Sequence, residues 1–130
     1  MAGSISTTAT DAGLGTTKYA IAWTSDASGG VSANTVAVKT GRLHQVKFIP
    51  AGGGNAPTDL YDVTLLDADG VDLLFGAGTD RFTATSNFAA PRIGSGVNTG
   101  LVFIEGGNVT PTITNAGNVK QGTLVLYIGP

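Results

Sequence analysis

The stretch Lys18-Tyr-Ala-Ile-Ala-Trp-Thr24 alternates large apolar residues with small or polar ones. Tyr19, Ile21 and Trp23 fall on one side of an extended chain, and the intervening residues fall on the other. This period of two is that of a half-buried β-strand, because successive side chains of a strand point to opposite faces. The stretch therefore predicts a strand with an aromatic inner face.

The same period continues along most of the chain. We expect strands over residues 18–24, 31–39, 42–49, 60–66, 71–75, 101–105, 109–114 and 122–128, with turns rich in Gly, Asn, Asp and Pro between them. The strongest hairpin signal is Asp67-Ala-Asp-Gly70, between two apolar runs. No segment sustains the spacing of an amphipathic helix. Seven to eight short strands predict an all-β fold, an antiparallel sandwich or barrel, and we favour the antiparallel β-sandwich.

Length and composition narrow the class of protein. The chain has 130 residues, of which 12% are charged, and its formal net charge is −2. A typical charged share is about 25%. The chain therefore lacks the basic surface that binding to nucleic acid or to an anionic membrane requires, so we expect neither partner. We expect a single β-sandwich domain over residues 17–130.

The first 16 residues differ from the rest. Only Ile5 and Leu14 are large and apolar there, among Ser, Thr, Ala and Gly. Such a segment buries too little apolar surface to offset the entropy of its own ordering. It predicts a flexible N-terminal arm over residues 1–16, either a frayed terminus or an arm that orders against a neighbouring subunit. The segment has no signal-peptide pattern, so we expect synthesis in the cytoplasm.

The sequence offers little for catalysis or for a cofactor. His44 is the single histidine, Glu105 is the single glutamate, and there is no cysteine. A nucleophilic triad or a general acid–base pair needs more partners than these, so we expect no enzyme, no catalytic residue and no cofactor. Asp67, Asp69 and Asp72 resemble part of a calcium loop, but too few carboxylates are present to complete a calcium shell. We expect these aspartates to serve the turn, and no metal site.

The aromatic residues Tyr19, Trp23, Phe48 and Tyr61 could form a sugar-binding platform if they were exposed. They all occupy positions on the inward side of their predicted strands. We therefore expect them in the core.

Two predicted strands are apolar on both faces. They are the segments Leu101–Ile104 and Gly122–Ile128. A sheet of a small isolated sandwich has one wet face, so strands like these need cover from a second layer, from loops or from another subunit. The predicted subunit interface consists of Leu101, Phe103, Val125 and Tyr127.

The segment from Gly41-Arg-Leu43 to Tyr61-Asp-Val-Thr-Leu-Leu-Asp-Ala-Asp-Gly-Val-Asp-Leu-Leu74 resembles small virion proteins of tailed bacteriophages, and so does Ile113-Thr-Asn-Ala-Gly-Asn-Val-Lys-Gln-Gly-Thr-Leu-Val-Leu-Tyr-Ile128. The resemblance covers residues 35–128 and is greatest to capsid decoration, or cement, proteins. It implies a jelly-roll-like sandwich on the outer face of the phage head, a homotrimer, the major capsid protein as partner, and no catalytic residues.

Two other functions are compatible with the same fold. One is another virion component, such as a head fibre base or a β domain of the neck or tail. The other is a carbohydrate-binding or adhesin module, which would need exposed aromatic side chains in a row.

Overall fold

The computed structural model describes residues 3–95 and 98–130, and it places ten strands in two antiparallel sheets. The large sheet has the order β1-β2-β10-β4-β8-β7, with β6 paired to β4, and the small sheet has the order β3-β9-β5. The strands are β1 (Ser4–Gly13), β2 (Thr16–Thr24), β3 (Val36–Val38), β4 (Gly41–Pro50), β5 (Asp62–Leu66), β6 (Asn87–Ala89), β7 (Arg92–Ser95), β8 (Asn98–Ile104), β9 (Gly107–Thr114) and β10 (Gln121–Gly129).

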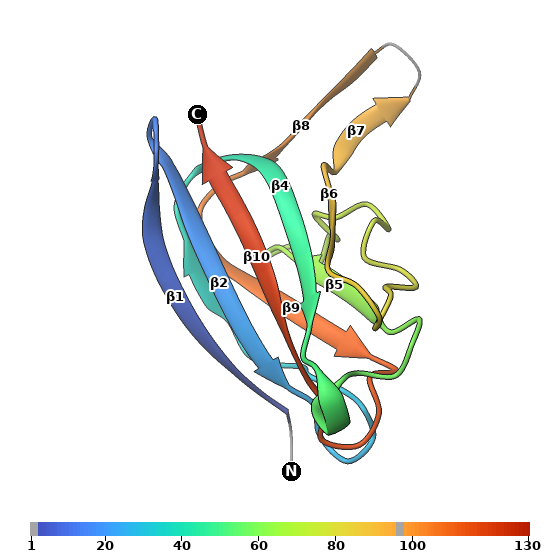
Figure 1. Ribbon diagram of the computed structural model, residues 1–130. Coiled ribbons are helices and arrows are strands. Elements are labelled where there is room, and N and C mark those ends of the chain that lie inside the picture. The colour runs from blue at the N-terminus through green and yellow to red at the C-terminus, as the bar shows by residue number, and fades with distance from the viewer. Residues whose placement is uncertain (1–2, 96–97) are drawn as a thin grey trace.

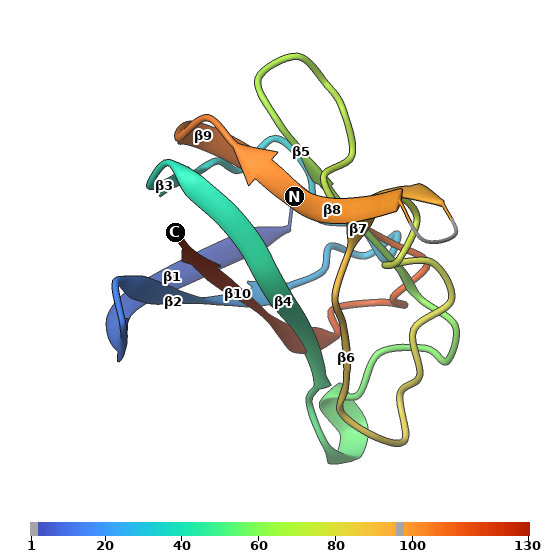
Figure 2. The same ribbon diagram turned by 90° about the horizontal axis from the view of Figure 1, so that it is seen from above.

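The two sheets lie face to face, which confirms the predicted antiparallel β-sandwich. Figures 1 and 2 show β2, β10 and β4 in one layer and β5 and β9 in the other. The β7–β8 hairpin extends beyond the body of the sandwich (Figure 1). The one helical element in the described residues is a 3₁₀ turn at Gly53–Asn55. None of those residues forms a helix long and apolar enough to cross a membrane.

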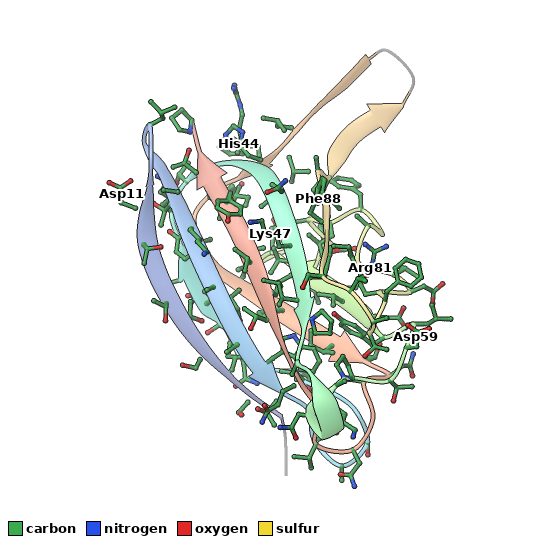
Figure 3. All side chains as sticks on the ribbon, in the orientation of Figure 1. Asp11, His44, Lys47, Asp59, Arg81 and Phe88 are labelled. Carbon is green, nitrogen blue, oxygen red and sulfur yellow. The ribbon has the colours of Figure 1, made fainter. Side chains whose placement is uncertain are left out.

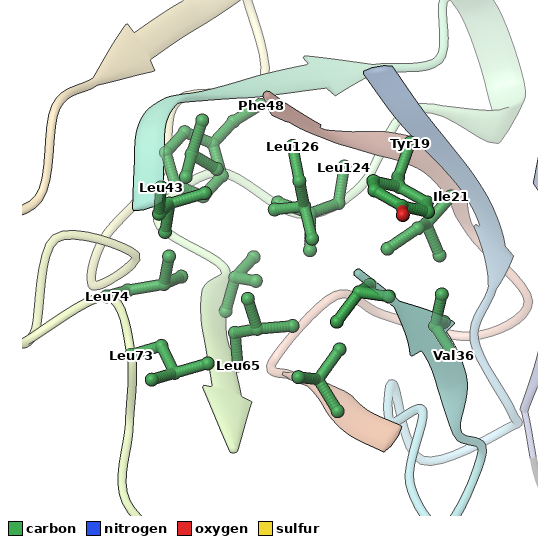
Figure 4. Packing of buried hydrophobic residues seen from close by; sticks show 14 of the residues in the cluster. Tyr19, Ile21, Val36, Leu43, Phe48, Leu65, Leu73, Leu74, Leu124 and Leu126 are labelled. Atoms are coloured by element: carbon green, nitrogen blue, oxygen red, sulfur yellow. The ribbon is translucent and has the colours of Figure 1, made fainter. Parts of the chain in front are cut away.

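The core lies between the sheets, where side chains of the large sheet meet those of the small sheet (Figure 4). Tyr19, Ile21 and Trp23 of β2 all point into it, as the period of two predicts. Trp23 packs against Tyr61 with ring centroids 5.7 Å apart. All four aromatic residues assigned to the core from the sequence are buried there, namely Tyr19, Trp23, Phe48 and Tyr61.

The structure gives most of the predicted N-terminal arm a place in the sheet. Residues 4–13 form β1, which pairs antiparallel with β2 of the same chain from Ser4↔Thr24 to Gly13↔Thr16. Apart from the half-buried Ile5, every side chain of β1 is exposed. Backbone pairing, which leaves no mark in the hydrophobic pattern, holds this segment against β2. The flexibility expected for residues 1–16 remains a prediction.

The strand predicted over residues 71–75 is wrong, although the turn before it is correct. Asp67 Oδ1 accepts hydrogen bonds from the N–H groups of Asp69 and Val71, both at 2.9 Å. After a single bridge between Leu66 and Asp72 the chain leaves the sheet. The Asp72 carboxylate accepts N–H bonds from Leu65, Leu74 and Gly76 at 3.0–3.1 Å, so it ties the turn that follows to β5.

Candidate interaction surface

The side of the large sheet that faces away from the core is built from rows of residues paired across four or five strands. One row runs Thr8, Ala20, Val125, Lys47 and Phe88, from β1 to β6. The flanking rows are Ser6, Ala22, Thr123 and Ile49 on one side, and Thr10, Lys18, Tyr127 and Gln45 on the other. We call these 13 residues the outer face. Figure 3 shows Lys47 and Phe88 on neighbouring strands of it.

The outer face has no carboxylate. Its charged residues are Lys18 and Lys47. Apart from Lys18, its residues on β1 and β2 are small Ser, Thr and Ala. Six of the nine acidic residues of the chain lie instead in residues 59–80, in β5 and its loops. Figure 3 shows Asp59 there, on the side of the molecule away from β1. This distribution of charges makes the outer face weakly basic and the segment of residues 59–80 acidic.

The structure places the four predicted interface residues outside the core, on the outward side of β8 and β10, with very different exposure. Phe103 is 60% exposed and lies opposite Arg42 of β4. Leu101 and Tyr127 are half-buried. Val125 is only 2% exposed. Phe103 therefore offers the most free surface of the four, and Val125 offers almost none.

Val125 is buried by its own neighbours. Ala20 of β2 and Lys47 of β4 flank it in the sheet. The Lys47 Nζ atom lies 5.2 Å from the ring centroid of Tyr127, so the lysine side chain leans along the strand beside Val125. An ammonium over an aromatic face is attracted to it, while the methylene stem covers apolar surface. The cover predicted for Val125 thus comes from within the chain.

Phe88 is a surface residue that the sequence pattern did not reveal. It is 66% exposed and lies on β6, opposite Lys47. Arg81 holds this strand in place, because its Nη1 donates to Asn87 Oδ1 at 3.0 Å and its guanidinium lies 4.9 Å from the Phe48 ring centroid. A strand of three residues in a Gly-, Ala- and Ser-rich stretch is too short to show a period of two.

His44 lies at an irregularity of β4 and not on its inner face. The register of β4 against β10 shifts here, so that Gln45 pairs with Tyr127 and Leu43 pairs with Ile128. Leu43, with Val46 and Phe48, therefore faces the core. His44 is half-buried at the surface, with Nε2 3.1 Å from the carbonyl oxygen of Pro130 (Figure 3).

The acidic turn forms one wall of a cavity of about 140 Å³ beside β8. Asp67, Asp69, Phe103 and Glu105 are among its lining residues. Asp67 is occupied with the N–H groups of its own turn, as predicted from the Asp-Gly signature. Within residues 3–95 and 98–130 there is no group of three or more His, Asp or Glu side chains placed to hold a metal ion.

No protein-family model, no curated protein and no solved structure matches this chain.

Proposed function

We propose that this chain is a structural protein of a bacteriophage particle, a capsid decoration protein that binds the major capsid protein on the outer surface of the head and stabilises the shell. The observation that carries the proposal is the outer face, together with Phe103 beside it. The outer face is free of carboxylates and poor in charge, and it bears Phe88, which is 66% exposed, while Phe103 is 60% exposed on the neighbouring strand β8. Depletion of charge and enrichment in aromatic residues distinguish interface cores from other protein surface.

The strand order supports the jelly-roll form of the sandwich. A jelly roll is an eight-stranded double sheet in which the first strand pairs with the last, the second with the seventh, the third with the sixth and the fourth with the fifth. The corresponding pairs here are β2·β10, β3·β9, β4·β8 and β5 with the segment at Arg81. The fifth strand is reduced to the bridge between Tyr61 and Arg81.

Each attached copy would add a small binding free energy to the stability of the shell, and the many copies on one head would add up. Full burial of one phenylalanine side chain contributes about 1.5–3 kcal/mol to binding. Phe88 lines a groove together with Lys47, Ile49, Ser86 and Asn87. A protein that binds the assembled lattice and not its free subunits stabilises the lattice by mass action. Self-association as a homotrimer on the capsid, through Leu101, Phe103 and Tyr127, is part of the proposal, and the number three comes from the family resemblance.

The test is co-sedimentation of the purified chain with capsids of its phage from which the chain has been removed. We expect the wild-type protein to bind. Phe88→Glu should lower the affinity for the capsid at least tenfold, since it places a carboxylate against the major capsid protein. Phe103→Glu should also lower it, since it places a carboxylate in the contact between neighbouring copies.

Val71→Glu is the matched control, because Val71 is 50% exposed but lies in the acidic turn. It should bind like the wild type. Failure of the wild-type protein to bind, or equal loss in all three variants, would contradict the proposal. Circular dichroism of each variant checks that the sandwich is intact.

A further inference from the structure

The strand β1 forms an open edge of the large sheet. It extends over ten residues and pairs with β2 alone among the described residues. An edge strand presents a row of backbone N–H and C=O groups that are free to pair with another chain. Natural proteins block such edges with lysine, proline, a bulge or a covering loop. Residues 4–10, Ser-Ile-Ser-Thr-Thr-Ala-Thr, have none of these, and the first register shift comes only after Asp11.

The small sheet does not have an edge of this kind. One of its edge strands, β3, has three residues. The other, β5, is covered by residues 72–81, since Val63 N–H donates to Gly78 O at 2.8 Å and Arg81 N–H donates to Tyr61 O at 2.7 Å. At the far side of the large sheet, β7 has four residues. Only β1 is both long and uncovered within residues 3–95 and 98–130.

We propose that β1 is a self-association site at which two copies of this chain pair their β1 strands antiparallel about a twofold axis at Thr7. Along a strand, the backbone N–H and C=O groups of successive residues point alternately to one side and to the other. Two residues that lie opposite each other in an antiparallel pair must both point these groups at the partner strand or both point them away. The two residue numbers of each pair must therefore sum to an even value. A sum of 14 uses all of residues 4–10 and pairs Ser4 with Thr10 and Ile5 with Ala9.

Charge and hydrogen bonding both favour this register. The one charge on the strand, Asp11, lies beyond the paired segment, and the two copies of it are about 27 Å apart at 3.4 Å per residue. The neighbouring register, centred on Thr8, would set Asp11 against Ile5. Seven paired residues form about six to eight backbone hydrogen bonds, within the range of about 10 ± 5 found in protein interfaces. The outer face stays free, so this contact is independent of the proposed function.

Single cysteines test the pairing, because the natural chain has none. In Thr7→Cys the two sulfurs would lie on directly opposite residues, whose Cα atoms are about 4.5 or 5.5 Å apart, and a disulfide spans either distance. In Thr10→Cys the two cysteines would be about 20 Å apart. Both positions are exposed on the same strand. We expect Thr7→Cys to form a disulfide-linked dimer under mild oxidation and Thr10→Cys to stay unlinked.

Charge variants test the same contact without a covalent bond. Sedimentation over a concentration series should show a reversible dimer for the wild-type protein. Thr7→Lys and Thr7→Asp should each weaken the dimer at least tenfold, and a mixture of the two should restore it as a heterodimer. A wild-type protein that stays monomeric at the highest concentration, or equal cross-linking of the two cysteine variants, would overturn the proposal. Unchanged thermal melting of the variants excludes loss of fold as the cause.

Discussion

Gly122 of β10 leaves room for the Trp23 ring of the neighbouring strand β2 because it has no side chain. A methyl group at this position would lie 2.5 Å from Cζ2 of Trp23, which is itself only 3% exposed. We expect Gly122→Ala to lower the free energy of unfolding by about 1–3 kcal/mol through overpacking. Urea unfolding measures the change. Gly52→Ala is the control, because a methyl there meets nothing within 4 Å and φ is −91°. Equal stabilities of the two variants would contradict this packing.

A second single residue, Tyr61, makes the stability of the fold depend on pH. Burial raises the pKa of its phenol from 10.0 to about 12, and the nearby positive charge of Arg81 only partly offsets this. The folded state therefore keeps the proton between pH 10 and pH 12, while the unfolded state loses it. The unfolded state is favoured as the pH rises, by about 2 kcal/mol at pH 12.

Denaturant unfolding of wild type and Tyr61→Phe over this pH range tests the linkage. The stability difference between the two proteins should be constant below pH 10 and should shift in favour of Tyr61→Phe above it. Parallel pH profiles for the two proteins would show that the Tyr61 phenol ionises equally in both states.

At the scale of elements, the Asp72 carboxylate helps to hold the segment that covers the edge of β5. Asp72 accepts N–H bonds from Leu65, Leu74 and Gly76, so its removal leaves three donors without their partner. We expect Asp72→Ala to cost about 1–3 kcal/mol of unfolding free energy. Asp69→Ala is the matched control in the same loop, because Asp69 enters the turn through its backbone N–H, and it should change stability by less than about 0.5 kcal/mol. Thermal or urea unfolding that ranks the two variants the other way would contradict this role.

The N-terminal strand leads to a second prediction about elements. Since β1 buries almost no side-chain surface, its local unfolding should cost far less than global unfolding. We expect its amides to exchange with solvent much faster than those of β10 when the protein is dilute. Hydrogen exchange at several protein concentrations measures this. Protection of β1 equal to that of β10 in the dilute monomer would contradict the expected flexibility of residues 1–16.

The elements that could be predicted from the sequence are those with one buried face. Strands β2, β4 and β9 alternate buried side chains with half-buried or exposed ones over much of their length, so a period of two reveals them. Strand β1 is exposed on both faces and β6 has only three residues, so neither has a pattern to read. The register shift of β4 at His44 could not be predicted from the sequence either, because a bulge is defined only by the pairing with the partner strand.

For the candidate site, the sequence predicted outward apolar residues on β8 and β10 but not how exposed they are. Phe103 is exposed as an interface residue requires, whereas Val125 is covered by Lys47 and Ala20. The register of the strands and the rotamer of each side chain decide which residue of a neighbouring strand covers a given position. A period of two in the sequence determines neither of them. Phe88 enters the outer face through a strand pairing that has no local sequence signal.

The whole molecule separates most of its acidic residues from the outer face. The acidic residues gather in residues 59–80, and the outer face across β1, β2, β10, β4 and β6 has lysines and no carboxylate. A chain with a net charge of only −2 gains little solubility from its charge. This arrangement suits a protein that is covered on one side by a larger assembly.

Cryo-electron microscopy of the phage particle that incorporates this chain tests the proposed function most directly. The map should show the sandwich on the outer surface of the head, with the outer face and its Phe88 buried against the major capsid protein, Phe103 at the contact between copies, and residues 59–80 away from the capsid. Absence of the chain from the head, or attachment with the outer face toward solvent, would contradict the proposal.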